Sequence, residues 1–105
     1  GEQIRDFTFV DDIVRANLLA AERDVRPGSV FNVSGGTSIS VNEVLEVLAG
    51  IAGRPLEVDR TDAVAGDVRQ TGGSADRIRD QLGWEPTVDI ESGLRAQWRS
   101  LGGEA

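Results

Sequence analysis

The sequence lacks five residue types on which much enzyme chemistry depends. Among its 105 residues there is no Cys, His, Met, Tyr or Lys, so all 11 basic residues are Arg. Catalysis by a Ser–His pair, a thiol, a Schiff-base Lys, a His base or a Tyr acid requires side chains that are missing. Zinc sites built from Cys and His are excluded for the same reason. These absences remove much chemistry before any motif is considered, and we assign no catalytic residue and no metal ligand to this chain.

The missing cysteines also bear on the cellular setting. Without Cys there is no disulfide framework, so a reducing, cytoplasmic location is expected. No apolar run approaches the roughly 18 residues of a membrane helix, and no signal-peptide pattern opens the chain. The 18 acidic residues outnumber the Arg residues and give a net charge of −7, which argues against nucleic acid or an anionic membrane as partner. The first residue is Gly rather than Met, as in an internal fragment or a tag remnant.

The apolar content is sufficient for one folded domain. Hydrophobic residues make up 39% of the sequence, which is above the level typical of disordered chains. A chain of this length buries about two thirds of the surface that its unfolded form exposes, which supports a single core. We therefore expect residues 1–105 to form one domain.

Hydrophobic spacing predicts an α/β chain with short strands and three to four helices. The helices are expected at residues 10–22, 41–52, 75–82 and 90–101, and the strands at 4–9, 30–33 and 56–59, with a possible short strand near Val68. Ser40 and Glu43 match a capping box at the start of the second helix, and Gly53 is placed to end it. Residues 60–73 show no regular pattern, which is typical of a segment that binds a ligand or moves.

The first of these helices carries a mainly apolar stripe at helical spacing, made of Val10, Ile13, Val14, Asn17, Leu18 and Ala21. Asp11 and Asp12 fall in its first turn, where the helix dipole favours acidic residues. Adjacent carboxylates can also suggest metal binding or acid–base chemistry, but neighbours on a helix point about 100° apart. Pairing with the dipole is the favoured interpretation.

Three further features each allow two interpretations. Residues 34–38, SGGTS, form a glycine-containing turn that could hold a phosphate, yet they lack the GxGxxG spacing and favour a plain turn. Arg5 is either a surface ion-pair residue or a ligand contact, and Asp67 is either a turn residue or a binding residue. Trp84 and Trp98 are expected to pack in the core or at a corner.

The order of several segments resembles a known enzyme family. Residues 1–12, 30–36, 40–44, 66–67 and 82–86 read GEQIRDFTFVDD, VFNVSGG, SVNEV, GD and LGWEP. This series is similar to the C-terminal part of extended short-chain dehydrogenases/reductases, and within them to NAD-dependent sugar-nucleotide epimerases and dehydratases of the UDP-glucose 4-epimerase type. The resemblance covers nearly the whole chain and implies the substrate-binding portion of that fold without its N-terminal Rossmann half.

The resemblance also implies a function and a set of site residues. The absent half would bind NAD and supply the Tyr-x-x-x-Lys catalytic pair, and the intact enzyme would be a homodimer acting on a UDP- or dTDP-sugar. The implied substrate-binding residues are Gln3, Arg5, Asp67 and Arg69, with Arg5 on the diphosphate and Asp67 on the ribose hydroxyls. The chain departs from the family at Val64, where a second phosphate-binding Arg is usual, and Arg60 or Arg69 is a candidate substitute.

Two other functions stay open on the sequence alone. The same fold could act as a non-catalytic module that binds a nucleotide or a protein. The chain could also be an inactive structural fragment that associates through apolar surface left bare by the missing half. Residues upstream of Gly1 would distinguish these functions from a segment of an enzyme.

Overall fold

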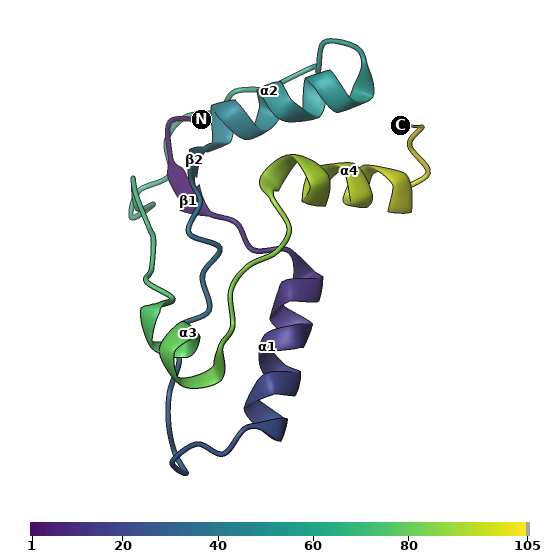
Figure 1. Cartoon of the computed structure of the whole chain (residues 1–105). Coiled ribbons are helices and arrows are strands. Elements are labelled where there is room, and N and C mark those ends of the chain that lie inside the picture. The colour runs from purple at the N-terminus through teal and green to yellow at the C-terminus, as the bar shows by residue number, and fades with distance from the viewer. Residues whose placement is uncertain (105) are drawn as a thin grey trace.

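A short antiparallel sheet joins two lobes of the molecule. Strand β1 (Ile4–Asp6) pairs with β2 (Ser38–Ser40), with Arg5 opposite Ile39. The computed structural model describes residues 1–104 and has extents of 48 × 36 × 17 Å. Figure 1 shows α2 (Val41–Ala52) and α4 (Ile90–Ser100) on one side of the sheet, and α1 (Val10–Glu22) and α3 (Asp76–Leu82) on the other.

The first two helices begin and end where local sequence signals predict. The bounds of α1 match the expected range, and the Oγ of Ser40 accepts a hydrogen bond from the backbone N of Glu43 at 3.1 Å. Gly53 ends α2 in the left-handed conformation, at φ 70°, which glycine adopts without a steric penalty. These signals lie within a few residues of each helix end, so they act without help from the rest of the fold.

The last two helices also form close to their expected positions. Gly83 ends α3 at φ 69°, and Glu91 and Arg95, four residues apart on α4, form an ion pair at 3.1 Å. The N-cap of α3 is Ala75 rather than Ser74, although the Ser74 Oγ accepts from the Asp76 backbone N at 3.3 Å. The predicted number of helices is therefore confirmed, with an error of one residue at two of the ends.

The strand predictions were largely wrong. Residues 30–33 and 56–59 form no strand in the described chain, the first strand stops at Asp6, and β2 was not expected. Near Val68 there is only an isolated parallel bridge between Ile4 and Gln70. A strand needs a partner for its backbone hydrogen bonds, and local pattern does not reveal that partner. Residues 30–33 instead lie along the core, with Phe31 and Val33 packed against it.

Most of the expected stripe of α1 is exposed in this chain, although Ile13 is half-buried. Val10, Val14 and Leu18 are 63%, 50% and 57% exposed, and Ala16 lies on the buried side. The core of this lobe consists of Ala16, Ile78, Leu82 and Trp84. The helix period correctly predicted α1, but the packing partner decides which stripe is buried. Among the described residues, no helix is both long and apolar enough to cross a membrane.

Asp12 has a different role from the dipole pairing expected of it. Its side chain is 2% exposed and accepts hydrogen bonds from the Thr87 backbone N (3.0 Å), the Thr87 Oγ1 (2.8 Å), the Val88 backbone N (3.1 Å) and Arg15 (3.3 Å). Its carbonyl oxygen accepts from the Trp84 Nε1 at 2.9 Å. Burial raises the pKa of Asp12, but the hydrogen bonds from Thr87, Val88 and Arg15 outweigh it and lower the pKa below its ordinary value. Asp12 therefore fastens α1 to the segment that leads into α4.

Candidate functional site

The N-terminal segment is held against the first turn of α2. The backbone N of Val41 donates to the Gln3 carbonyl at 3.0 Å, and that of Asn42 donates to the Gly1 carbonyl at 2.9 Å. Because side chains alternate along an extended chain, Gln3 and Arg5 point to the same side. The free amides at the start of α2 thus fix the segment that carries both side chains.

The loop after residue 63 is docked on the other edge of β1. The backbone N of Ile4 donates to the Arg69 carbonyl at 2.8 Å, and the backbone N of Thr71 donates to the Ile4 carbonyl at 3.0 Å. A turn closed by Asp67 N and the Val64 carbonyl at 3.1 Å comes just before this contact, with Gly66 at φ 88°. The loop therefore presents Asp67 beside β1.

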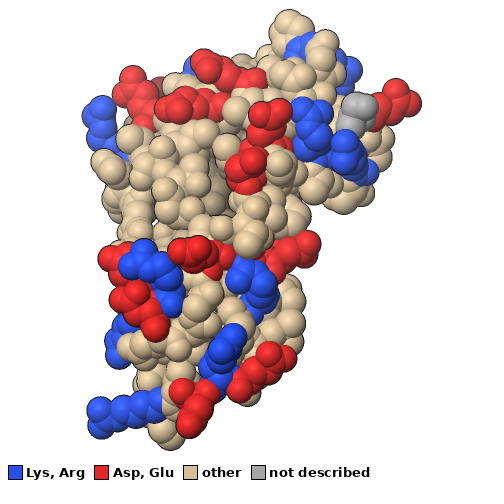
Figure 2. Space-filling view, viewed as in Figure 1, with Lys and Arg blue, Asp and Glu red and all other residues tan. Residues whose placement is uncertain are grey.

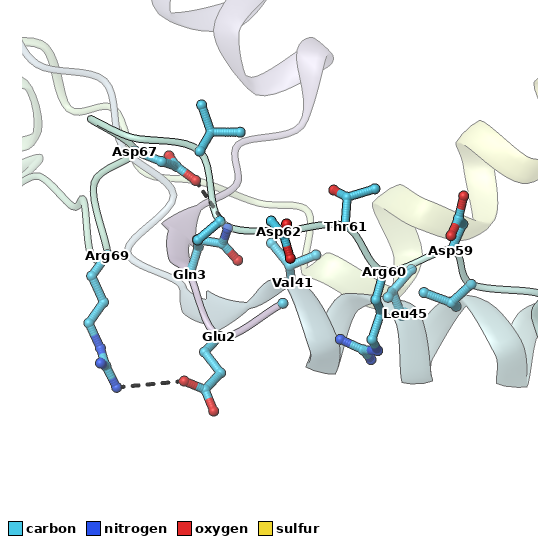
Figure 3. A pocket seen from close by; sticks show the side chains of 14 residues that line it. Glu2, Gln3, Val41, Leu45, Asp59, Arg60, Thr61, Asp62, Asp67 and Arg69 are labelled. Atoms are coloured by element: carbon cyan, nitrogen blue, oxygen red, sulfur yellow. Dashed lines mark hydrogen bonds and ion pairs between the residues drawn. The ribbon is translucent and has the colours of Figure 1, made fainter.

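The Asp67 carboxylate lies between two donors from the N-terminal segment. The Gln3 Nε2 donates to Asp67 Oδ2 at 3.0 Å, and the Arg5 Nη2 donates to Asp67 Oδ1 at 3.0 Å. Figure 3 shows the Gln3 amide turned toward Asp67. The side chains of Arg5 and Asp67 are 27% and 40% exposed. Three of the four residues that the resemblance implied for substrate binding thus form one cluster, although they are 62 and 64 positions apart in the sequence.

Arg69, the fourth implied residue, lies nearby but is not part of this cluster. Its Nη2 is 3.9 Å from a Glu2 carboxylate oxygen, and both side chains are more than four-fifths exposed. Arg60 donates to the Asn42 Oδ1 at 3.0 Å. A loose surface pair of this kind contributes about 0–1 kcal/mol, so Arg69 can be recruited by a ligand at little cost.

A cleft of about 670 Å³ brings these side chains together. It lies between residues 1–3, the first turns of α2 and residues 58–69, and its walls include Gln3, Asp67, Arg60 and Arg69 (Figure 3). Arg5 is not part of the wall but pairs with Asp67, which is. Guanidinium groups bind phosphate oxygens, and a carboxylate accepts hydrogen bonds from hydroxyl groups. The cleft therefore has the side chains to hold an anion next to a hydroxylated group.

Val64 also lines this cleft and is 73% exposed. The position at which the family usually has an Arg thus faces the same space as Asp67. Asp59 and Asp62 lie on the wall as well, so acidic side chains outnumber the two arginines there. An anionic ligand in this cleft would depend strongly on the few guanidinium groups available.

A dinucleotide cofactor does not fit the glycine-containing turn of this chain. The Thr37 backbone N donates to the Asp6 Oδ1 at 3.2 Å, and that of Gly36 faces the Ser34 Oγ at 3.4 Å. The turn leads into β2 rather than directly into a helix, and the first amides of α2 already donate to Gly1, Gln3 and Ser40. A pyrophosphate needs such amides free. The hydrogen bonds within this turn therefore favour the plain-turn interpretation, although the turn joins no strand to a helix directly.

Sequence reasoning missed the supporting role of Asp6 in this turn. Its carboxylate also accepts from the Ser34 Oγ, and Gly35 lies so close to the Phe7 carbonyl that a Cβ would collide with it. Alternation along β1 was the available signal, because it places Asp6 on the face opposite Arg5. Asp6 therefore holds the turn on one face of β1, and Arg5 holds the loop on the other.

A second cleft of about 490 Å³ lies between the start of α1 and α4 and is mainly apolar. Its walls include Phe7, Phe9, Val10, Ile90 and Leu94. Figure 2 shows a broad area with few charged side chains in the upper left of this face, above a band of charged side chains that crosses its middle. The polar groups able to bind an anion thus gather at the first cleft rather than at this one.

Comparisons with known proteins place the chain in a family. The model of the GDP-mannose 4,6 dehydratase family matches residues 1–97. The UDP-glucose 4-epimerase of Mycolicibacterium smegmatis is 35% identical over 94 residues, which are 90% of this chain and 30% of that protein.

Two solved structures share the fold closely. The UDP-glucose 4-epimerase of Thermotoga maritima with UDP-glucose gives a TM-score of 0.85 at 38% identity, over 96% of this chain and 33% of that one. The UDP-glucuronic acid 4-epimerase of Bacillus cereus, in complex with UDP-glucuronic acid and NAD, gives a TM-score of 0.91 at 29% identity. The match covers 97% of this chain and 33% of that one. The chain thus spans about a third of the length of these relatives.

The family match and the shared fold agree with the resemblance in the sequence. Other relatives include the GDP-6-deoxy-D-mannose reductase of Pseudomonas aeruginosa, which is 35% identical over 101 residues. This chain therefore belongs to the GDP-mannose 4,6 dehydratase family of sugar-nucleotide epimerases, dehydratases and reductases within the short-chain dehydrogenases/reductases.

Proposed function

We propose that this chain is the sugar-nucleotide-binding segment of an enzyme resembling UDP-glucose 4-epimerase. The observation that carries the proposal is the meeting of Gln3, Arg5 and Asp67 beside one cleft, with Arg69 on its wall. In this proposal Arg5 and Arg69 bind the diphosphate, and Asp67 accepts hydrogen bonds from the ribose hydroxyls. Relatives solved with UDP-glucose or UDP-glucuronic acid support the choice of a UDP-sugar.

The chemical step would be carried out by a part of the enzyme outside this chain. NAD, when bound there, would accept and return a hydride. The sequence has no Tyr, Lys or His to move a proton in such a reaction, and its glycine-containing turn does not fit a dinucleotide. The task of these residues is to bind the substrate and orient it toward the cofactor.

A calorimetric titration of the purified chain with UDP-glucose tests the proposal. We expect saturable binding that UDP competes for and that glucose alone does not, because the nucleotide diphosphate makes the proposed contacts. We also expect no sugar interconversion and no NADH formation above a heat-inactivated control. Arg95→Ala is a matched control, since Arg95 forms a similar, half-exposed ion pair on α4 away from the cleft. Absence of UDP-glucose binding would refute the proposal and favour a structural fragment.

A further inference from the structure

We infer that Gln3 is a positioning residue that orients the Asp67 carboxylate toward the hydroxyl groups of the ligand. The inference rests on the proposed function and assigns the discrimination between ribose and deoxyribose to a pair of side chains. Gln3 Nε2 holds one oxygen of Asp67 at 3.0 Å, while Arg5 holds the other at the same distance. A carboxylate oxygen that accepts one such bond keeps a further lone pair for a ligand hydroxyl.

The chemistry of the pair fixes the orientation of both groups. A carboxylate only accepts hydrogen bonds, so the amide of Gln3 must present its Nε2 to Asp67 and cannot be reversed. Because Gln3 is neutral, it aligns the carboxylate without neutralising it and leaves its strength as an acceptor intact. Arg5 places a positive charge beside Asp67, and Gln3 fixes the orientation of its carboxylate.

An unsatisfied atom on Gln3 supports a functional reason for this geometry. The Oε1 of Gln3 is buried and has no hydrogen-bond donor among the described residues. An unpaired buried acceptor costs free energy, and such groups call for an explanation beyond stability. In this chain the unpaired acceptor belongs to the same amide that donates to Asp67 from the wall of the cleft.

The two partners also differ in how firmly their backbones are held. The carbonyl of Gln3 accepts from the Val41 backbone N, which fixes it to the first turn of α2. Every residue from 57 to 74 is exposed, and the backbone hydrogen bonds that join this loop to β1 are made at Arg69 and Thr71 rather than at Asp67 itself. The orientation of Asp67 thus depends on side-chain contacts from the firmly held segment, and Gln3 is one of two that reach it.

The test compares UDP with 2′-deoxy-UDP in calorimetric titrations of the full chain. The ratio of the two dissociation constants measures what the ribose hydroxyl contributes. In the unaltered chain we expect UDP to bind about threefold to tenfold more tightly, as one hydrogen bond contributes. In Gln3→Leu we expect the ratio to fall toward one, with 2′-deoxy-UDP bound nearly as before. Gln81→Leu, at an exposed position on α3, is the control and should keep the ratio.

A second variant guards against a fault in folding. Gln3→Glu keeps the size and shape of the side chain but turns a carboxylate oxygen toward Asp67 in place of the amide donor, so the ratio should fall as in Gln3→Leu. An unchanged midpoint of urea unfolding shows that this variant is folded, so a fall in its ratio cannot come from lost packing. If the unaltered chain binds UDP but shows no preference, or if Gln3→Leu keeps the preference, the inference is wrong while the proposed function stands. If the unaltered chain does not bind UDP, the proposed function fails and the inference with it.

Discussion

Two carboxylates, Asp12 and Asp67, each join distant segments of this chain, but they do so in opposite settings. Asp12 is 2% exposed, and its carboxylate accepts four hydrogen bonds from other groups of the chain. Asp67 is 40% exposed and accepts from only Gln3 and Arg5 on the wall of a cleft. A buried carboxylate with all its positions filled can only stabilise the fold, whereas a half-exposed one has capacity left for a ligand.

The largest effect is expected from removing the buried carboxylate. Asp12→Ala leaves the backbone amides of Thr87 and Val88 and the guanidinium of Arg15 without their acceptor. We expect the free energy of unfolding to fall by about 3 kcal/mol or more, a large part of the roughly 5–15 kcal/mol typical of a domain. The midpoint of urea unfolding measures this loss.

Asp67→Ala is the matched comparison for that substitution. Its exposed pair with Arg5 should contribute less than about 1 kcal/mol to the free energy of unfolding. If both variants lose similar stability, the contrast between the two carboxylates is wrong.

The next largest effect concerns ligand binding rather than stability. Arg5→Ala should weaken the binding of UDP-glucose about tenfold to a hundredfold, because a hydrogen bond to a charged group contributes roughly 1.5–3 kcal/mol. Calorimetric dissociation constants for Arg5→Ala and the control Arg95→Ala measure the difference. An unchanged constant for Arg5→Ala would mean that Arg5 only ties β1 to the loop.

Acid unfolding separates the two carboxylates in another way. The pKa of Asp12 is lowered in the folded state, so the stability it contributes is present above its ordinary pKa and disappears as the pH falls through the folded value. Below about pH 4 the unaltered chain should therefore lose stability more steeply than Asp12→Asn. Urea midpoints across this pH range measure the two slopes, and parallel slopes would contradict the prediction.

Asp89 adds an acid dependence of its own to both proteins in that comparison. The backbone hydrogen bond from Ser92 at the start of α4 lowers the pKa of Asp89. The difference between the two slopes, rather than either slope alone, therefore reports on Asp12.

The smallest effect should come from restoring charge to the cleft. Val64→Arg places a guanidinium where the family usually has one, on the wall that already holds Asp67. We expect UDP-glucose to bind about threefold more tightly, since an exposed ionic contact is weak. Val68→Arg adds the same charge to the loop outside the wall and should change the affinity less. Equal effects of the two variants would point to net charge rather than to a placed contact.

The sequence by itself determined the helices, and it named in advance the residues that meet at the candidate site. The period of apolar residues, the Ser40 cap and the glycines at 53 and 83 act within a single turn, so their outcome could be predicted locally. The resemblance implied Gln3, Arg5, Asp67 and Arg69 as binding residues, and the first three lie in contact. The absence of Tyr, Lys and His likewise predicts that the chemistry belongs to residues outside this chain, which stays a prediction.

Only the tertiary structure decided the pairing of strands and the burial of each face. Residues 30–33 have the apolar pattern of a strand but find no ladder partner in the described chain, while residues 38–40 pair with β1. Asp12 shares a helical face with Ala16, yet its role depends on Thr87 and Val88, more than seventy positions away. Hydrogen-bond partners and buried faces are set by contacts between distant segments, so no local pattern contains them.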